Sequence, residues 1–432
     1  MKRKVVREAL SSYAPPLTRP LLWATVLVVV VGSVRGIIVI NTPASPTLVY
    51  QSTAVLLLLL ASIGFIERRK FKSPQLTPLK NLMILSLVLG VINVAIDLVL
   101  GLGFEAGNLY VYLASYVVFV FLRIPPRYLI GAVVVAALMI SYSVADNFRH
   151  SLGGPAGLQE VFDYNVRLRP DLFQALSRTG EFYRAGGYTG SYHDSANILG
   201  MASSFAAVRF LLRRSWLDLG LFLVTIVCLT LTQSAANIVI AIGTIVLFAC
   251  YSVIKQPKTS ALVYLGLAAL GVVGIVAVFG DAMGIFLLRV GSEGDWAGIT
   301  TRLGWDWIVT SLPYFVAGHA DAYGSKNVYI EFSVLKTLLQ TGIIHTFILL
   351  GILVFPVYRF LKIKPRCMRS LPSLAGVSFG VLSLLHYGSL FRVTSIFLFF
   401  ALYAVCLTEL LACAQSPTAA SKPPLVPAPA LV

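Results

Sequence analysis

The chain is poor in charged residues and in cysteine. Only 12% of its 432 residues are Asp, Glu, Lys or Arg, which is about half the share in a typical soluble domain. This scarcity excludes a soluble enzyme and a disordered chain. The five cysteines include no CxxC pair, so their spacing indicates neither a disulfide framework nor a zinc site. The histidines form no HExxH pair, and we expect no metal and no cofactor.

Apolar residues are abundant instead, at 57% of the chain. They form runs that approach the roughly 20 residues a helix needs to cross a bilayer, whereas a transmembrane barrel would show alternating segments of about 10 residues. The candidate spans are residues 21–40, 48–66, 81–104, 109–122, 128–145, 195–212, 216–232, 235–254, 261–280, 343–361, 371–390 and 394–413. The run 109–122 is the shortest. The pattern predicts an all-α polytopic membrane protein with about twelve transmembrane helices, in one membrane domain over residues 21–415.

Acidic residues are particularly scarce, with 18 against 34 Lys and Arg. A net charge of +16 could indicate nucleic-acid binding, but the distribution of the basic residues argues against it. With residues 1–20 in the cytoplasm, most Lys and Arg fall in short inner segments, as the positive-inside rule requires. We therefore expect both termini to be cytoplasmic, including a flexible Pro- and Ala-rich tail at residues 416–432, and no nucleic-acid partner.

Two segments on the predicted outer side, residues 146–194 and 281–342, are too long to be simple turns. Loops of this length are usually functional or disordered, and these two contain Trp and Tyr among apolar residues. Residues 328–340 predict an amphipathic helix that ends at Gly342. All five histidines fall on this side or at outer helix ends, and so do several arginines that could bind phosphate bidentately.

The segment 281–342 contains an ordered set of polar, aromatic, proline and glycine residues. In chain order they are Thr301, Arg302, Trp305, Asp306, Trp307, Pro313, Gly318, His319, Asp321, Tyr323, Gly324, Lys326, Asn327, Tyr329, Glu331 and Gly342. This order resembles the large outer loop of the Wzy-type polysaccharide polymerase and O-antigen ligase superfamily. There, Arg and Trp precede a Pro, a Gly-containing turn, and a polar residue with Asn that opens an amphipathic helix.

The resemblance covers roughly residues 186–390, because a second motif also matches. The turn at residues 186–190, Gly-Gly-Tyr-Thr-Gly, precedes Asn197 at the start of a span, and the superfamily has an aromatic and Gly-rich turn before Asn at the corresponding place. Two departures are present. Ligases of the superfamily usually carry His just before the second Asn, where this chain has Lys326. The superfamily also often has Ser-Arg after the span that matches residues 216–232, whereas no Arg follows that span here.

The resemblance implies a GT-C-like membrane architecture on the bacterial inner membrane. It implies an outer-leaflet glycosyltransferase that joins polyprenyl-diphosphate-linked oligosaccharide units into O-antigen or exopolysaccharide. A flippase and a chain-length regulator are the implied protein partners. Preorganised Arg side chains would neutralise the diphosphate leaving group, and His or a carboxylate would deprotonate the acceptor hydroxyl. The implied catalytic residues are Arg302, Arg289, His319 and Asp321. The implied substrate-binding residues are Arg184, Tyr188, Asn197, Trp305, Tyr323, Lys326 and Asn327.

Simpler roles remain open for these residues. The arginines could form surface salt bridges, the aromatic residues could pack in the core, and the two asparagines could cap helices. An O-antigen ligase shares the fold and the chemistry, although Lys326 argues against it. A lipid-glycan flippase is the alternative from another class, although the spans carry little charge near their midpoints. Within the spans, Arg35 is expected to reach the outer surface by snorkelling and to pair with Asp97.

Overall fold

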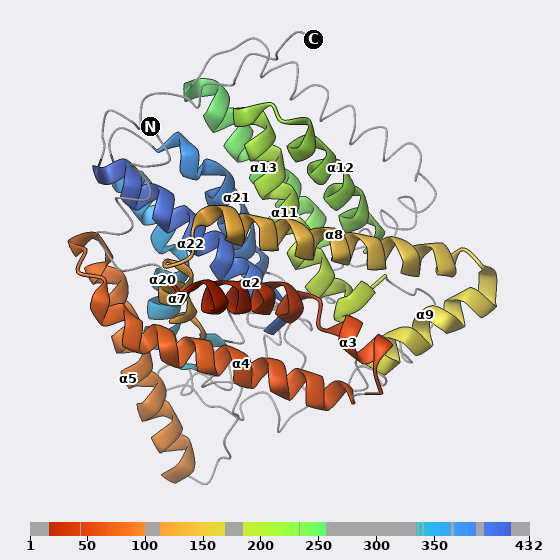
Figure 1. The fold of residues 1–432 in the computed structure, drawn as a ribbon, viewed down its shortest axis with the longest axis horizontal. Helices are drawn as coiled ribbons and strands as arrows, with labels where there is room; N and C mark the ends of the chain where they lie inside the picture. Colours follow the sequence, from red (N-terminus) through yellow and green to blue (C-terminus); the bar gives the residue numbers. More distant parts are fainter. Residues whose placement is uncertain are drawn as a thin grey trace, which may run out of the picture.

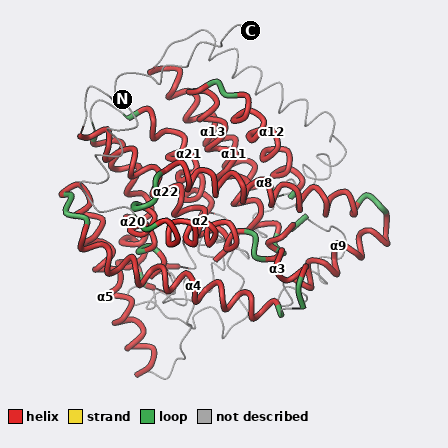
Figure 2. Tube along the Cα trace, viewed as in Figure 1, coloured by secondary structure: helices red, strands yellow, loops and turns green. Residues whose placement is uncertain are grey.

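The computed structural model describes residues 17–43, 45–99, 113–168, 185–232, 234–255, 341–363, 367–385 and 393–415, with three further residues between 334 and 338. This part of the chain is helical and contains no strand, as Figure 2 shows. The longer helices are α2 (Arg19–Ser33), α4 (Pro46–Glu67), α5 (Thr77–Val99), α8 (Pro126–Ser151), α9 (Gly154–Leu168), α11 (Tyr192–Arg213), α12 (Trp216–Leu231), α13 (Ala235–Lys255), α20 (Ile343–Lys362), α21 (Leu371–Leu382) and α22 (Val393–Gln415). The short elements are α3 (Gly36–Asn41), η1 (Arg68–Lys70), η2 (Pro74–Leu76), α7 (Val117–Phe121), η4 (Gly187–Thr189), η5 (Met368–Ser370) and η6 (Ser383–Leu385).

Eight helical stretches within the described residues are long and apolar enough to cross a membrane, and α2 and α12 are shorter apolar helices. Helices are the expected form for such runs, because a bilayer offers no water to satisfy the backbone polar groups. The prediction of an all-helical membrane protein is confirmed. Of the twelve expected spans, residues 261–280 lie outside the described part, and in 109–122 the described helix is only α7.

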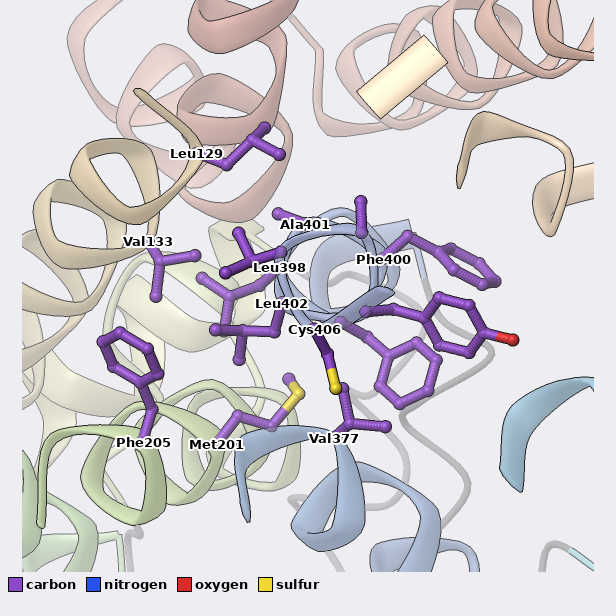
Figure 3. Close-up of a cluster of buried hydrophobic side chains, with 14 of the residues drawn as sticks. Leu129, Val133, Met201, Phe205, Val377, Leu398, Phe400, Ala401, Leu402 and Cys406 are labelled. Carbon is purple, nitrogen blue, oxygen red and sulfur yellow. The ribbon is translucent and has the colours of Figure 1, made fainter. Parts of the chain in front are cut away.

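The hydrophobic core is centred on α22, which is the most buried of the candidate spans. Figure 3 shows Leu398, Ala401 and Leu402 of this helix among side chains from α8, α11 and α21. Close approach of α11 to α21 depends on Gly200, because a Cβ at this position would collide with the ring of Phe379. Small residues at such contacts are typical of helix packing in membranes.

The two ends of the helix bundle differ in their content of basic residues, and we call them the basic end and the η4 end. The basic end carries Arg68, Arg123, Arg213 and Arg369 near the ends of α4, α7, α11 and η5. The η4 end contains α3, η4, α9 and the start of α11. Figure 1 shows the axes of α2, α4 and α8 lying roughly parallel, with α4 running in the opposite chain direction to the other two, and α3 and α9 close together at the η4 end.

Two expectations differ from the structure. The run 21–40 is two helices rather than one, because α2 ends at Ser33 and α3 begins at Gly36. A disulfide joins Cys367 to Cys413, although the spacing of the cysteines indicated none. The two residues are 46 positions apart, and the packing of α22 beside η5 brings their Cα atoms to 5.9 Å, a normal separation for a disulfide.

The predicted helix stop at Gly342 is confirmed. Its N–H donates to the carbonyl of Leu338 at 2.8 Å, and its φ of +80° ends the preceding helical turn before α20 begins. Glycine adopts this left-handed backbone without the steric cost of a Cβ. Most of the amphipathic helix predicted over residues 328–340 lies outside the described residues.

Candidate functional site

The structure describes two of the predicted site residues, Tyr188 and Asn197. Both lie at the η4 end, in one continuous segment of η4 and the first turns of α11. The predicted residues outside the described part are Arg184, Arg289, Arg302, Trp305, His319, Asp321, Tyr323, Lys326 and Asn327. The described part of the candidate site therefore consists of the η4 segment and its neighbours.

The η4 segment is a tight turn held by buried hydroxyl groups. The Thr189 hydroxyl donates to the carbonyl of Ser191 at 2.6 Å, and the Ser195 hydroxyl donates to the carbonyl of Gly186 at 2.6 Å. Gly190 has a φ of +67°, which explains why glycine follows the aromatic residue of the motif. These bonds attach the turn rigidly to the first turn of α11.

The turn also contacts α8 and α3. The backbone N–H of Tyr188 donates to the Ser143 Oγ of α8 at 2.9 Å. On the other side, the carbonyl of Tyr188 lies so close to Gly36 that a Cβ there would overlap it. The break between α2 and α3 therefore has a structural reason, because it lets the backbone at Gly36 meet the turn.

The break also places Arg35 in the interior. This residue is 4% exposed, and its guanidinium lies 3.8 Å from the centre of the Tyr50 ring. Such a cation–π contact stabilises a cation away from water. The expectation that Arg35 reaches the outer surface is thus wrong, because its side chain is buried against the Tyr50 ring. The expected pairing with Asp97 falls on a side chain outside the described set.

The first turns of α11 are buried although they are polar. His193 is 7% exposed, Asp194 0% and Asn197 1%. Within the described part of the chain, neither amide atom of Asn197 has a hydrogen-bond partner. A buried amide without a partner costs roughly 1–3 kcal/mol, so it is rarely retained for packing alone. Capping does not explain this residue, because it lies in the second turn of the helix rather than at its N-cap.

Further polar side chains lie on the helices that contact α11. Asn147 of α8 is 4% exposed, and its Nδ2 has no partner among the described residues. Asn237 of α13 is 1% exposed and donates to the Ser234 Oγ at 3.1 Å. The η4 end thus provides amides and hydroxyls that suit a polyhydroxylated ligand. No group of three His, Cys, Asp or Glu residues that could hold a metal occurs within the described ranges.

Sequence reasoning missed Arg35 and Asn147 as members of this site. The sequence identifies Arg35 as an intramembrane charge but predicts that it reaches the surface. Asn147 lay beyond the predicted end of its span at residue 145, whereas α8 continues to Ser151. The sequence pattern that could have identified Asn147 is its spacing from Ser143. The two polar residues are four positions apart, which places them on one face of α8.

At the basic end, ion pairs and a charged hydrogen bond connect neighbouring helices. Arg209 Nε lies 3.2 Å from Asp218 Oδ1, and Arg123 Nη1 lies 2.8 Å from Glu67 Oε2. Ser373 donates to the Glu409 carboxylate at 3.1 Å. These contacts join α11 to α12, α4 to the α7 segment and α21 to α22, so their role is to hold the helix ends together.

In comparisons with known proteins, no family model matches the chain and no curated protein matches it.

Proposed function

We propose that the protein is a glycosyltransferase that polymerises polyprenyl-diphosphate-linked oligosaccharide units into O-antigen or exopolysaccharide. The proposed site is on the outer leaflet of the bacterial inner membrane, with both termini cytoplasmic, in a GT-C-like bundle of about twelve spans. The same lipid-linked unit serves as donor and as acceptor. A flippase that supplies the unit and a chain-length regulator are the expected partners.

The distribution of charge supports this orientation. Lys and Arg residues near helix ends are retained on the cytoplasmic side, and the basic end carries Arg68, Arg123, Arg213 and Arg369. The η4 end then faces outward, where lipid-linked oligosaccharides are polymerised. The segment of the chain that resembles the polymerase and ligase superfamily at residues 186–200 lies at this end.

The observation that carries the proposal is the buried amide of Asn197, whose two polar atoms have no hydrogen-bond partner among the described residues. It lies in the second turn of α11, which follows an aromatic and Gly-rich turn, and it belongs to the motif that resembles the superfamily. A primary amide can donate to and accept from sugar hydroxyls or phosphate oxygens. A bound substrate would satisfy both amide atoms and offset the cost of burying them.

The proposed reaction is a displacement at the anomeric carbon of the donor. The acceptor hydroxyl oxygen forms the new glycosidic bond, the bond between the anomeric carbon and the diphosphate oxygen breaks, and polyprenyl diphosphate leaves with the bonding electron pair. The hydroxyl proton passes to the base, for which His319 and Asp321 are the candidates. Arg302 and Arg289 are assigned to the negative charge that develops on the diphosphate, with Arg184 as a further candidate.

Two other functions fit parts of the observations. An O-antigen ligase would use the same donor chemistry, but Lys326 stands where ligases usually have His. A transporter would place polar groups near the membrane midplane, often on broken helices. The break at Arg35 lies instead beside the η4 turn, which favours an enzyme with its site at one end.

The test is a mass-spectrometric profile of lipid-linked glycans in cells that lack the protein, complemented with the wild type, Asn197→Ala or Asn41→Ala. Asn41 is the control because it is an exposed asparagine whose amide bonds locally to the carbonyl of Ile37. We expect single units to accumulate with Asn197→Ala and with no protein, and polymer to form with Asn41→Ala. Long glycan on the carrier would indicate a ligase, and single units on the inner leaflet would indicate a flippase; either result would overturn the proposal.

A further inference from the structure

Four side chains gather where α8, α9 and η4 meet, which we call the tyrosine cluster: Tyr142, Asp146, Tyr164 and Tyr188. Tyr142 and Asp146 are four residues apart on α8 and therefore share one face of that helix. Tyr188 is held beside them, because its N–H bonds to Ser143 at 2.9 Å. None of these side chains except Tyr188 belongs to the segments that resemble a known family.

Helix α9 brings Tyr164 to the same place by folding back along α8. Residues 152–153 join the two helices, and Figures 1 and 2 show the corner between them. The His150 Nδ1 lies 2.9 Å from Glu160 Oε2 across this corner, and Gly157 packs against the carbonyl of His150. The end of α9 is fixed to α4, because the Tyr50 hydroxyl donates to the carbonyl of Leu168 at 2.7 Å.

The electrostatics agree that the four groups are neighbours. Burial and the charges of Tyr188, Asp146 and Tyr142 raise the pKa of Tyr164. Burial and the charges of Tyr142 and Asp146 raise the pKa of Tyr188. Both phenols therefore stay protonated at neutral pH and can donate hydrogen bonds.

The cluster is open to ligands on one side. Tyr142 is 66% exposed and the Asp146 side chain 39% exposed, while Tyr164 and Tyr188 are half-buried. Arg149 lies 3.1 Å from the Asp146 carboxylate and offsets its charge. The cluster thus offers aromatic faces, phenol hydroxyls and a charge-balanced carboxylate, which is suitable chemistry for a neutral polyol rather than for an anion.

We propose that the tyrosine cluster is a saccharide-binding subsite that holds neutral sugars of the growing glycan on the outer face. This proposal rests on the proposed function and extends it from the donor site to a second site at the α8–α9 corner. A sugar ring would lie against the exposed Tyr142 ring, and its hydroxyls would donate to the Asp146 carboxylate. Tyr164 and Tyr188 would form the inner wall.

The competing explanation is an aromatic belt residue that anchors α8 at the lipid interface. That role needs only an exposed aromatic ring and no carboxylate. It therefore predicts that Tyr142 matters and Asp146 does not. The two explanations can be separated by substituting the carboxylate and leaving the ring in place.

The experiment uses the full-length protein in nanodiscs and a panel of neutral trisaccharides made of glucose, galactose, mannose or rhamnose. Binding is measured by saturation-transfer difference NMR for the wild type, Tyr142→Ala, Tyr142→Phe and Asp146→Asn. The control Asp163→Asn removes an exposed carboxylate of α9 that accepts a bond from Gln159 at 2.8 Å. We expect at least one trisaccharide to bind the wild type and the control. Its affinity should fall about tenfold or more in Asp146→Asn, because the variant loses a hydrogen bond to a charged acceptor. Tyr142→Ala should also lower it, because the ring against which the sugar lies is removed, and Tyr142→Phe should retain most of it.

Two outcomes would overturn the subsite: no trisaccharide binds, or binding is equal in the wild type and Asp146→Asn. These results are distinct from failure of the proposed function. If cells without the protein accumulate no lipid-linked units, the polymerase proposal fails while trisaccharide binding at the cluster still stands. If they do accumulate units but Asp146→Asn leaves binding and polymer length unchanged, only the subsite fails.

Discussion

The Ser143 hydroxyl accepts a hydrogen bond from the backbone N–H of Tyr188 at 2.9 Å, across 45 residues of chain. This contact fixes the η4 turn on α8. Because the η4 turn is bonded to the first turn of α11, it also fixes the buried polar start of that helix. The neighbouring Ser141, on the same helix, has a buried hydroxyl with no partner in the described part of the chain. The two serines therefore form a matched pair for testing what the contact contributes.

Ser143→Ala should lower the free energy of unfolding by about 1 kcal/mol, since it leaves the N–H of Tyr188 without its acceptor. Ser141→Ala should be neutral or slightly stabilising, because it removes a buried polar group that makes no bond. Thermal unfolding of both variants in the same detergent would measure the difference. Equal shifts in Tm would show that the turn is held by other contacts.

Gly36→Ala should destabilise the protein by about 1–3 kcal/mol, because its Cβ would overlap the carbonyl of Tyr188 and force the backbone apart. Gly131→Ala is the control, since a Cβ at this position of α8 meets nothing within 4 Å. There the substitution should stabilise the helix by about 0.5–1 kcal/mol. Opposite changes in Tm are expected, and a stabilised Gly36→Ala variant would contradict the close approach of α3 to the turn.

Much of the helical framework could be predicted from apolar runs alone. The runs at residues 48–66, 195–212 and 394–413 correspond to α4, α11 and α22 within a few residues at each end. Hydrophobic length decides these elements locally. The helix ends do not follow from hydrophobic length alone. Helix α8 continues beyond its apolar run to Ser151, where tertiary contacts with α9 replace lipid.

The features that could not be predicted depend on residues far apart in the chain. The break at Arg35 is required by the carbonyl of Tyr188, which lies more than 150 positions later. The pairing of Cys367 with Cys413 follows from how η5 packs beside α22. At the candidate site, the sequence motif identifies Tyr188 and Asn197. The burial of Asn197 and the contribution of Ser143 and Asn147 from α8 follow only from the packing of the helices.

The buried ion pair of Arg209 and Asp218 gives a further prediction. The two side chains are 20% and 7% exposed, and their charged atoms are 3.2 Å apart. Asp218→Asn should cost about 3 kcal/mol of stability, because it removes the opposite charge nearest to a largely buried guanidinium. In a double-mutant cycle, the variant that combines Arg209→Leu and Asp218→Leu should lose less stability than the sum of the losses in Arg209→Leu alone and Asp218→Leu alone. Additive losses would show that the two charges do not interact.

The disulfide at the basic end provides a test of orientation. With Cys228, Cys250 and Cys406 as the free thiols, protein purified in air and then denatured should take up three maleimide labels, and five after reduction. In cells quenched with acid and alkylated under denaturing conditions, all thiols are accessible. The proposed orientation places Cys367 and Cys413 in the reducing cytoplasm, so five labels are expected there without reductant. Three labels in such cells would mean that the basic end faces an oxidising compartment, and the proposed orientation would be wrong. Five labels in air-purified protein would show that the two thiols do not pair.

The assigned roles of Arg302 and Arg289 predict the largest effects on activity. Removing a preorganised donor to a developing negative charge typically lowers the rate by roughly 10²–10³. Arg302→Ala and Arg289→Ala should therefore abolish full-length polymer while the variants remain in the membrane at wild-type amounts. Arg302→Lys should recover only part of the activity, since an ammonium keeps the charge but not the two-pronged geometry that matches a diphosphate. Arg69→Ala, at an exposed position of η1, is the control and should leave the polymer unchanged.

Full-length polymer from the Arg302→Ala and Arg289→Ala variants would show that these residues have no role in the reaction. Diphosphate stabilisation would then have to come from cations at the η4 end, of which Arg35 is the buried one in the described chain.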